Sequence, residues 1–237
     1  MRILLIFCIL GFASGCVTAQ YPHQTIGTIH QDNLLIGSEG ISIPLPDGDW
    51  KLIDYNVRIY NKGTSFGEGY LIQEKDNIAT GLVEFEISLD TIGQGYALSE
   101  ACGNLAFIHR VSKANYNGRE QDCWWIDNEG TKRMSGIADQ NNRAWNYIAT
   151  NNIKMPVEMV SVNYRRASRT RLMHVFYSFN PEITGISPSK YFDSYHSEWS
   201  TENLHRDSKK NKFINKLKIW GAEFDPRVSA GFNRRTQ

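Results

Sequence analysis

Hydrophobic and polar residues alternate along much of the first half of the chain. Three short segments alternate in this way and predict β-strands: residues 41–45, 50–53 and 55–60. Two longer segments, 69–75 and 81–89, lie around Lys75-Asp76-Asn77, and this arrangement predicts a β-hairpin. In the second segment Val83, Phe85, Ile87 and Leu89 alternate with polar residues and share one face. Because successive strand residues point to opposite faces, each such strand has one apolar face to bury. The pattern therefore predicts a β-rich first half.

The second half mixes strand-like and helix-like patterns. Short apolar segments at 105–108 and 122–126 predict buried strands, and residues 157–179 predict a long hairpin that turns near Ala167-Ser168. Three further segments are predicted to be helical: 138–153, 189–205 and 209–224. The expected fold class is α+β, a single domain with a largely antiparallel sheet and C-terminal helices.

The N-terminus has the pattern of a secretory signal peptide. Met1-Arg2 supplies one positive charge, and residues 3–12 form an apolar stretch of ten residues. A membrane-spanning helix needs about 20 apolar residues, so this stretch fits a signal peptide better than a span. We expect export from a bacterial cytoplasm, with residues 1–15 as the signal peptide, 16–35 as a tether and 36–237 as one α+β envelope domain.

Ala13-Ser14-Gly15-Cys16 resembles the lipobox of bacterial lipoproteins, although the position of Ala13 is usually leucine. In those proteins the cysteine becomes the mature N-terminus and carries a diacylglycerol. The resemblance implies lipid attachment at Cys16 and a membrane anchor, and Val17 in place of Asp favours the outer membrane. Val17-Thr18-Ala19 also satisfies the small-x-small rule of ordinary signal peptidase. Release as a soluble periplasmic or secreted protein that begins at Gln20 therefore stays open.

Charge and cysteine content narrow the classes of partner and site. The chain has 26 Lys and Arg and 25 Asp and Glu, so loss of Arg2 with the signal leaves a neutral exported part. Nucleic acid is not expected as a partner, because binding to phosphates needs a basic excess. Cys102 and Cys123 are the cysteines left in the domain, and we expect a disulfide between them. No Cys or His spacing is typical of a metal site, and we expect neither a metal nor a cofactor.

One predicted hairpin carries a concentration of positive charge. Arg165, Arg166, Arg169 and Arg171 fall around its turn and offer a contact for an anion. Anionic lipid headgroups, lipopolysaccharide phosphates and an acidic envelope protein are the candidate partners. Charge at a hairpin end also prevents edge-to-edge association of strands, and the sequence leaves both interpretations open.

Several short motifs are similar to those of a group of uncharacterised exported proteobacterial proteins. The motifs are Leu45-Pro46-Asp47-Gly48-Asp49-Trp50, Asn180-Pro181-Glu182 before Gly185, Trp199, Trp220 and Gly231-Phe232. They are spread over most of the exported part. The resemblance supports the α+β architecture and implies no activity.

The sequence contains no complete catalytic motif. Ser187-Pro188-Ser189-Lys190 has the S-x-x-K spacing of penicillin-binding enzymes, but the S-D-N and K-T-G elements of those enzymes do not occur. We therefore assign no catalytic residue and expect a membrane-tethered envelope lipoprotein with a non-catalytic binding or structural role. The alternative is a periplasmic hydrolase whose site is assembled from dispersed residues. An aromatic or arginine-rich binding surface would favour the first, and a cleft with convergent His, Asp and Ser side chains the second.

Overall fold

The computed structural model describes residues 24–37, 40–60, 64–91, 95–103, 107–115, 120–131, 143–190 and 197–234. The segment expected to be a signal peptide, the alternative cleavage site and Cys16 lie outside these ranges, so their expected roles stay predictions. No helix in the described ranges is long and apolar enough to cross a membrane.

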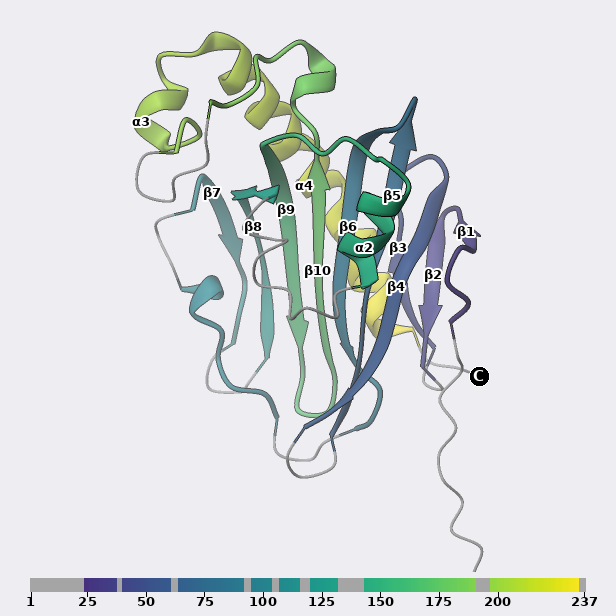
Figure 1. Ribbon diagram of the computed structural model, residues 1–237. Helices are drawn as coiled ribbons and strands as arrows, with labels where there is room; N and C mark the ends of the chain where they lie inside the picture. Colours follow the sequence, from purple (N-terminus) through teal and green to yellow (C-terminus); the bar gives the residue numbers. More distant parts are fainter. Residues whose placement is uncertain are drawn as a thin grey trace, which may run out of the picture.

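An eight-stranded antiparallel sheet forms the centre of the molecule (Figure 1). In spatial order its strands are β1 (Ile29–His30), β4 (Trp50–Ile59), β5 (Ser65–Lys75), β6 (Ile78–Ser88), β10 (Leu172–Phe179), β9 (Glu158–Ala167), β8 (Gln121–Gly130) and β7 (His109–Ser112). Strands β4–β6 and β7–β10 form two antiparallel meanders, and pairing of β6 with β10 joins them. Both predicted hairpins are present, and the predicted α+β class with a largely antiparallel sheet is confirmed.

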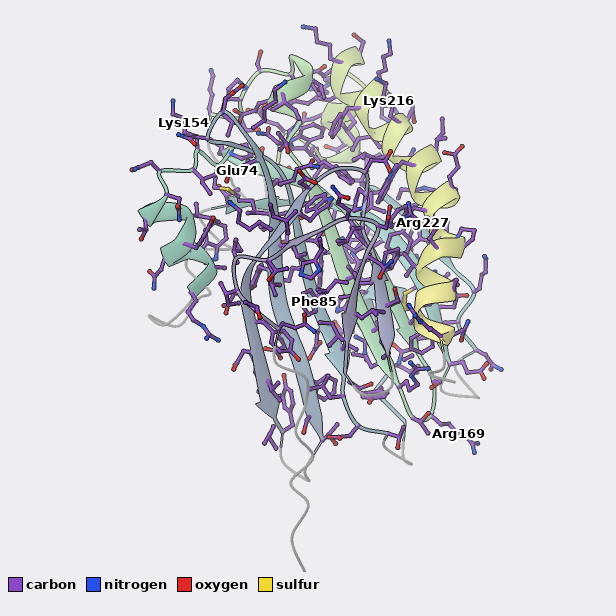
Figure 2. All side chains as sticks on the ribbon, turned by 90° about the vertical axis from the view of Figure 1, so that its right-hand side faces the viewer. Glu74, Phe85, Lys154, Arg169, Lys216 and Arg227 are labelled. Atoms are coloured by element: carbon purple, nitrogen blue, oxygen red, sulfur yellow. A yellow bond between two sulfur atoms is a disulfide. The ribbon has the colours of Figure 1, made fainter. Side chains whose placement is uncertain are left out.

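Helix α4 (Ser208–Asn233) covers one face of the sheet, which we call the helix face. Strands β2 (Asn33–Ile36) and β3 (Ile41–Pro44) form a small separate ribbon that packs on the same helix. The main hydrophobic core fills the layer between the sheet and these elements, and Phe85 lies within it (Figure 2). The alternation of the strands has thus placed most of their apolar residues on the helix face.

Close contact between α4 and the layers beside it depends on two glycines. A Cβ atom on Gly231 would clash with the carbonyl oxygen of Ser42, and one on Gly221 would lie 2.8 Å from the ring of Trp124. The hydroxyl of Tyr164 donates a hydrogen bond to the carbonyl of Gly221 at 2.7 Å. The helix therefore packs with its backbone against the sheet and the ribbon.

The opposite face of the sheet is covered at one end by α2 (Arg143–Thr150), which lies in front of the sheet in Figure 1. Ile148 of this helix packs with Ile72 and Leu82 in a second, smaller core. The guanidinium of Arg143 forms an ion pair with Asp54 at 3.0 Å. We call this side of the sheet the polar face, because Glu84, Glu86 and other polar side chains alternate onto it.

The predicted disulfide between Cys102 and Cys123 is present. It joins the short 3₁₀ helix η1 (Glu100–Cys102) to β8, and both cysteines are buried. Trp125 and Phe107 pack beside it with ring centroids 5.4 Å apart. The bond therefore fastens the segment before β7 to the edge of the sheet.

The folded domain begins earlier than the boundary expected at residue 36. Strands β1 and β2 fall within the predicted tether, and Leu34 and Ile36 are each only 1% exposed. They alternate with exposed residues in a strand of four residues, which is too short for the pattern to be distinguished from polar linker sequence. The tether expected over 16–35 therefore does not extend to its predicted end.

The predicted helices differ from the observed ones mainly in their ends. Helix α4 continues past the expected end at residue 224 and through Pro226, because Val228 and Phe232 pack into the main core beyond it. Within the expected helix 189–205 the described part contains loop residues and α3 (Thr201–Leu204), and residues 191–196 lie outside the description. A second 3₁₀ helix, η2 (Glu182–Thr184), follows β10.

Two further expectations lie partly outside the described ranges. The expected helix 138–153 is seen as α2, with residues 132–142 outside the description. The expected strand 105–108 is described only from residue 107, and β7 begins at His109.

Candidate functional site

A groove of about 440 Å³ opens between the turn before β4 and helix α4. We call it the aromatic groove. It is lined by residues from β4, β5, β10 and α4 and from the turn itself: Pro46, Asp47, Trp50, Gln73, Phe179, Trp220, Glu223, Phe224 and Arg227. Its volume and mixed aromatic and polar lining are typical of sites for a small ligand or a few side chains of a partner.

The turn that forms one wall of the groove is fixed by its own sequence. The indole nitrogen of buried Trp50 donates a hydrogen bond to the carbonyl of Pro46 at 2.8 Å, and the amide of Gln73 donates to the carbonyl of Asp47 at 3.0 Å. Gly48 has φ +110°, a conformation that side chains with a Cβ rarely adopt. The sequence Pro46-Asp47-Gly48-Asp49 thus builds a rigid wall that directs Asp47 to the rim.

The floor of the groove is aromatic. Trp220 and Phe224 are one helical turn apart on α4, and their rings stack with centroids 4.5 Å apart. Phe179, at the end of β10, meets Trp220 edge to face at 5.0 Å. Trp220 and Phe179 are only half-buried, so part of each ring faces the groove. Such a floor suits an apolar or aromatic group of a ligand.

The charged side chains that line the groove differ in the contacts they make with the rest of the protein. Arg227 points from α4 toward the ribbon and β4 (Figure 2), where its guanidinium donates to the carbonyl of Leu45 at 3.2 Å and lies 4.7 Å from the ring of Phe224. These contacts fix the position of the guanidinium, but the side chain is exposed and keeps its positive charge, so the groove has one cation beside two carboxylates. Asp47 and Glu223 are exposed carboxylates, and neither forms an ion pair with a described residue. The rim thus offers negative charge to a ligand.

The four arginines of the predicted anion contact do not share one surface. Arg165 and Arg166 are consecutive in β9 and therefore point to opposite faces of the sheet. Arg166 is 3% exposed and forms ion pairs with Asp122 and with Asp225 of α4. Its role here is to hold α4 against β8.

The other three arginines lie apart from Arg166. Arg165 is half-buried on the polar face and donates to the side-chain oxygen of Gln121 at 2.8 Å. Arg171 donates to the carbonyl of Arg234 and lies 5.6 Å from the ring of Phe232. Arg169 is exposed at the tip of the hairpin, at the lower end of the molecule in Figure 2. An anion contact at this tip stays a prediction, with Arg169 as its most accessible member.

Sequence reasoning did not identify the aromatic groove, although it named some of its parts. The motif from Leu45 to Trp50 and the isolated Trp220, which carry the resemblance to exported proteobacterial proteins, meet at this groove. Gln73, Phe179 and Arg227 come from other elements and had no motif to mark them. The signals in the sequence were the turn motif that ends in Trp50 and the isolated Trp220, and neither marks a groove by itself.

The chain matches no protein-family model, no curated protein and no solved structure. Its function must therefore be argued from the geometry of the described residues.

Proposed function

We propose that this protein is a bacterial envelope lipoprotein, anchored through Cys16, whose domain binds a partner without catalysing a reaction. The anchor is supported by the short apolar stretch and the cysteine that follows Ser14-Gly15. Export is also supported by the Cys102–Cys123 disulfide, because such bonds persist in oxidising compartments.

The observation that carries the binding role is the aromatic groove with its acidic rim. Half-buried rings of Trp220 and Phe179 supply apolar contact area, while Asp47 and Glu223 supply charge. A ligand that matches both has an apolar or aromatic group next to a positive charge. We propose that this ligand is a segment of another envelope protein that presents an apolar side chain beside Lys or Arg.

Binding of short peptides to the purified protein tests this role. Acetyl-Lys-Trp-Lys-amide should bind more tightly than acetyl-Glu-Trp-Glu-amide at low salt, and added salt should reduce the difference. Trp220→Leu should weaken both peptides. Asp47→Asn with Glu223→Gln should remove the preference for the cationic one, and Glu202→Gln on the exposed surface of α3 serves as the control. Equal binding of both peptides by the unmodified protein would contradict the proposal.

The anchor is tested separately by mass spectrometry of the mature N-terminus in the native host. We expect a diacylglycerol adduct on Cys16 and its loss in Cys16→Ala. Recovery of the unmodified protein with a free Gln20 would instead identify a soluble exported protein. That result would leave the binding role of the groove untouched.

A further inference from the structure

One exposed side of α4 carries a row of lysines along the first half of the helix. Lys209, Lys212 and Lys216 are spaced three and four residues apart, so they share this side. All three are exposed, as is Ile219, which follows them on the same side. We call these four residues the lysine stripe. The stripe ends where the aromatic groove begins, because Trp220 is the first helix residue of the groove.

No described carboxylate forms an ion pair with a lysine of the stripe. Helix α4 has no acidic residue before Glu223. Lys209 donates to the carbonyl of Gly185 at 3.4 Å, which leaves its charge in place. Lys210, by contrast, is buried and forms an ion pair with Glu198 at 2.5 Å. The helix thus has one buried, paired lysine and a row of unpaired lysines that face solvent.

The charges that flank the stripe along the chain do not cancel it. Asp207 precedes the helix, and its carboxylate accepts from the backbone N–H groups of Lys209 and Lys210. Lys218 is half-buried and raises the positive potential near His109. From Asp207 to Glu223 the chain has five lysines and two carboxylates. The first half of α4 therefore has a net positive charge.

Large apolar side chains lie exposed beside these lysines. Ile219, within the stripe, is 61% exposed. Ile183 of η2 is 54% exposed and lies two residues from Gly185, the residue that accepts from Lys209. Single exposed isoleucines are common on protein surfaces. These two, however, lie beside the same row of unpaired lysines, and each would gain from leaving water.

The shape and position of the stripe limit the kind of partner. The outer side of a helix is convex, whereas a small ligand needs a concave site. Lys216 lies at the upper end of the molecule and Arg169 at the lower end (Figure 2). The stripe is thus a second cationic feature, at the opposite end from the hairpin tip of the predicted anion contact. A convex row of cations suits an extended anionic surface.

The pairing of lysine with exposed isoleucine favours a lipid surface. Lysine side chains lay their carbon stems along apolar material and keep the ammonium at phosphate level. Isoleucine can enter the boundary between headgroups and acyl chains, as the apolar residues of surface-bound helices do. Each lysine near an anionic membrane strengthens binding about fivefold. An acidic protein would satisfy the lysines but would not by itself account for the isoleucines.

We propose that the lysine stripe docks on a bilayer that contains anionic phospholipids. Its ammonium groups contact lipid phosphates, and Ile219 enters the interface between them. This contact fixes the first half of α4 against the membrane and so sets the orientation of the domain. It depends neither on binding at the aromatic groove nor on a lipid at Cys16.

Lysine acetylation followed by peptide mass spectrometry tests the proposal on the unmodified protein. The protein is mixed with vesicles of phosphatidylcholine, either alone or with an equal part of phosphatidylglycerol. We expect the reactivity of the stripe lysines to fall about fivefold or more on the anionic vesicles only, and added salt should restore it. Lys154, on the side of the molecule away from α4 in Figure 2, should stay reactive. A lipid on Cys16 would hold the protein on both kinds of vesicle and so would not produce this difference.

Two changes connect the protection to the stripe, and each has a matched control. Lys212→Gln with Lys216→Gln should abolish the protection of Lys209. Lys75→Gln with Lys154→Gln removes the same charge from exposed positions elsewhere and should leave the protection unchanged.

Ile219→Gln keeps the charge of the stripe and should reduce the protection roughly threefold to tenfold, because the apolar side chain no longer enters the interface. Ile59→Thr is its control, because it removes an isoleucine that is 70% exposed on β4. It should have no effect on the protection. All of these positions are exposed, and thermal melting verifies that each variant is folded.

Three results would overturn the proposal. The first is an absence of preferential protection of the stripe lysines on the anionic vesicles. The second is equal protection on vesicles of phosphatidylcholine alone. The third is protection by soluble polyglutamate that equals the protection by anionic vesicles and is the same in Ile219→Gln, because an acidic protein would then be the better partner.

Discussion

Replacing Glu84 with glutamine should stabilise the protein at alkaline pH and have little effect at acidic pH. Desolvation is the largest cause that raises the pKa of this carboxyl, and the charge of Glu129 adds to it. A hydrogen bond with Tyr70 opposes the rise. The pKa in the folded state is about 7, against 4.5 for an unperturbed glutamate.

The magnitude follows from the linkage between protonation and folding. The folded state binds the proton more tightly than the unfolded state does, so the free energy of unfolding falls as pH rises from about 4.5 to about 7. A pKa difference of this size corresponds to roughly 3 kcal/mol of destabilisation above pH 7. Because a glutamine at this position does not titrate, Glu84→Gln should gain about 2 kcal/mol over the wild type between pH 5 and pH 8, and its amide can still bond to Tyr70.

Urea denaturation followed by tryptophan fluorescence at a series of pH values measures this difference. In thermal melts the same gain of about 2 kcal/mol should raise the melting temperature of the variant over the wild type by roughly 4–8 °C more at pH 8 than at pH 5. Glu202→Gln, at an exposed position on α3, should show no such trend. A difference between Glu84→Gln and wild type that stays constant with pH would refute the reasoning, because it would mean that Glu84 ionises as freely in the folded protein as in the unfolded chain.

Three further changes test how the layers are held together. Gly231→Ala should lower the free energy of unfolding by about 1–3 kcal/mol, because the added Cβ would clash with the Ser42 carbonyl oxygen. Gly103→Ala is the control and should have a small effect, and thermal melting of both variants measures the difference. Arg166→Met should cost about 3–5 kcal/mol by removing the buried partner of Asp225, which then keeps only the exposed Lys113 at 3.6 Å. Adding Asp225→Leu should recover most of that loss in urea denaturation. Replacing both Cys102 and Cys123 with serine should cost roughly 3 kcal/mol, and wild-type protein treated with a reductant should show a similar loss.

The sheet was the most predictable part of the molecule because its signal is local. In β6 Val83, Phe85 and Ile87 recur at every second position, and a register slip by one residue would expose all of them. The hairpin of β9 and β10 was predicted for the same reason, with its turn placed correctly after Ala167. The bulge between Leu52 and Asp54 was not predicted, because a bulge merges two alternating patterns into one strand without a distinctive sequence.

Tertiary contacts decided the features that the sequence did not reveal. Pro226 suggests a helix end, yet α4 continues because Val228, Gly231 and Phe232 gain contacts with the core and the ribbon. A proline inside a helix costs about 3 kcal/mol, so those contacts must offset it. The aromatic groove joins Gln73, Phe179 and Arg227, which are far apart in the sequence, and no local pattern marks such a set.

Arg165 and Arg166 show why neighbouring charges in a sequence need not form one charged surface, because successive residues of a strand point to opposite faces of the sheet. They are adjacent in the chain and looked like two parts of one anion contact. Arg166 faces α4, where two aspartates neutralise it and it fastens the helix to the sheet. Arg165 faces the other way, beside His174 and Glu86. The same alternation that buries Val83, Phe85 and Ile87 against α4 places Glu84 and Glu86 beside the strand of His174. In each strand taken alone, these polar residues look like a charged edge that faces solvent. Once the three strands are in register, they form a compact block in which two buried polar atoms lack a partner among the described residues.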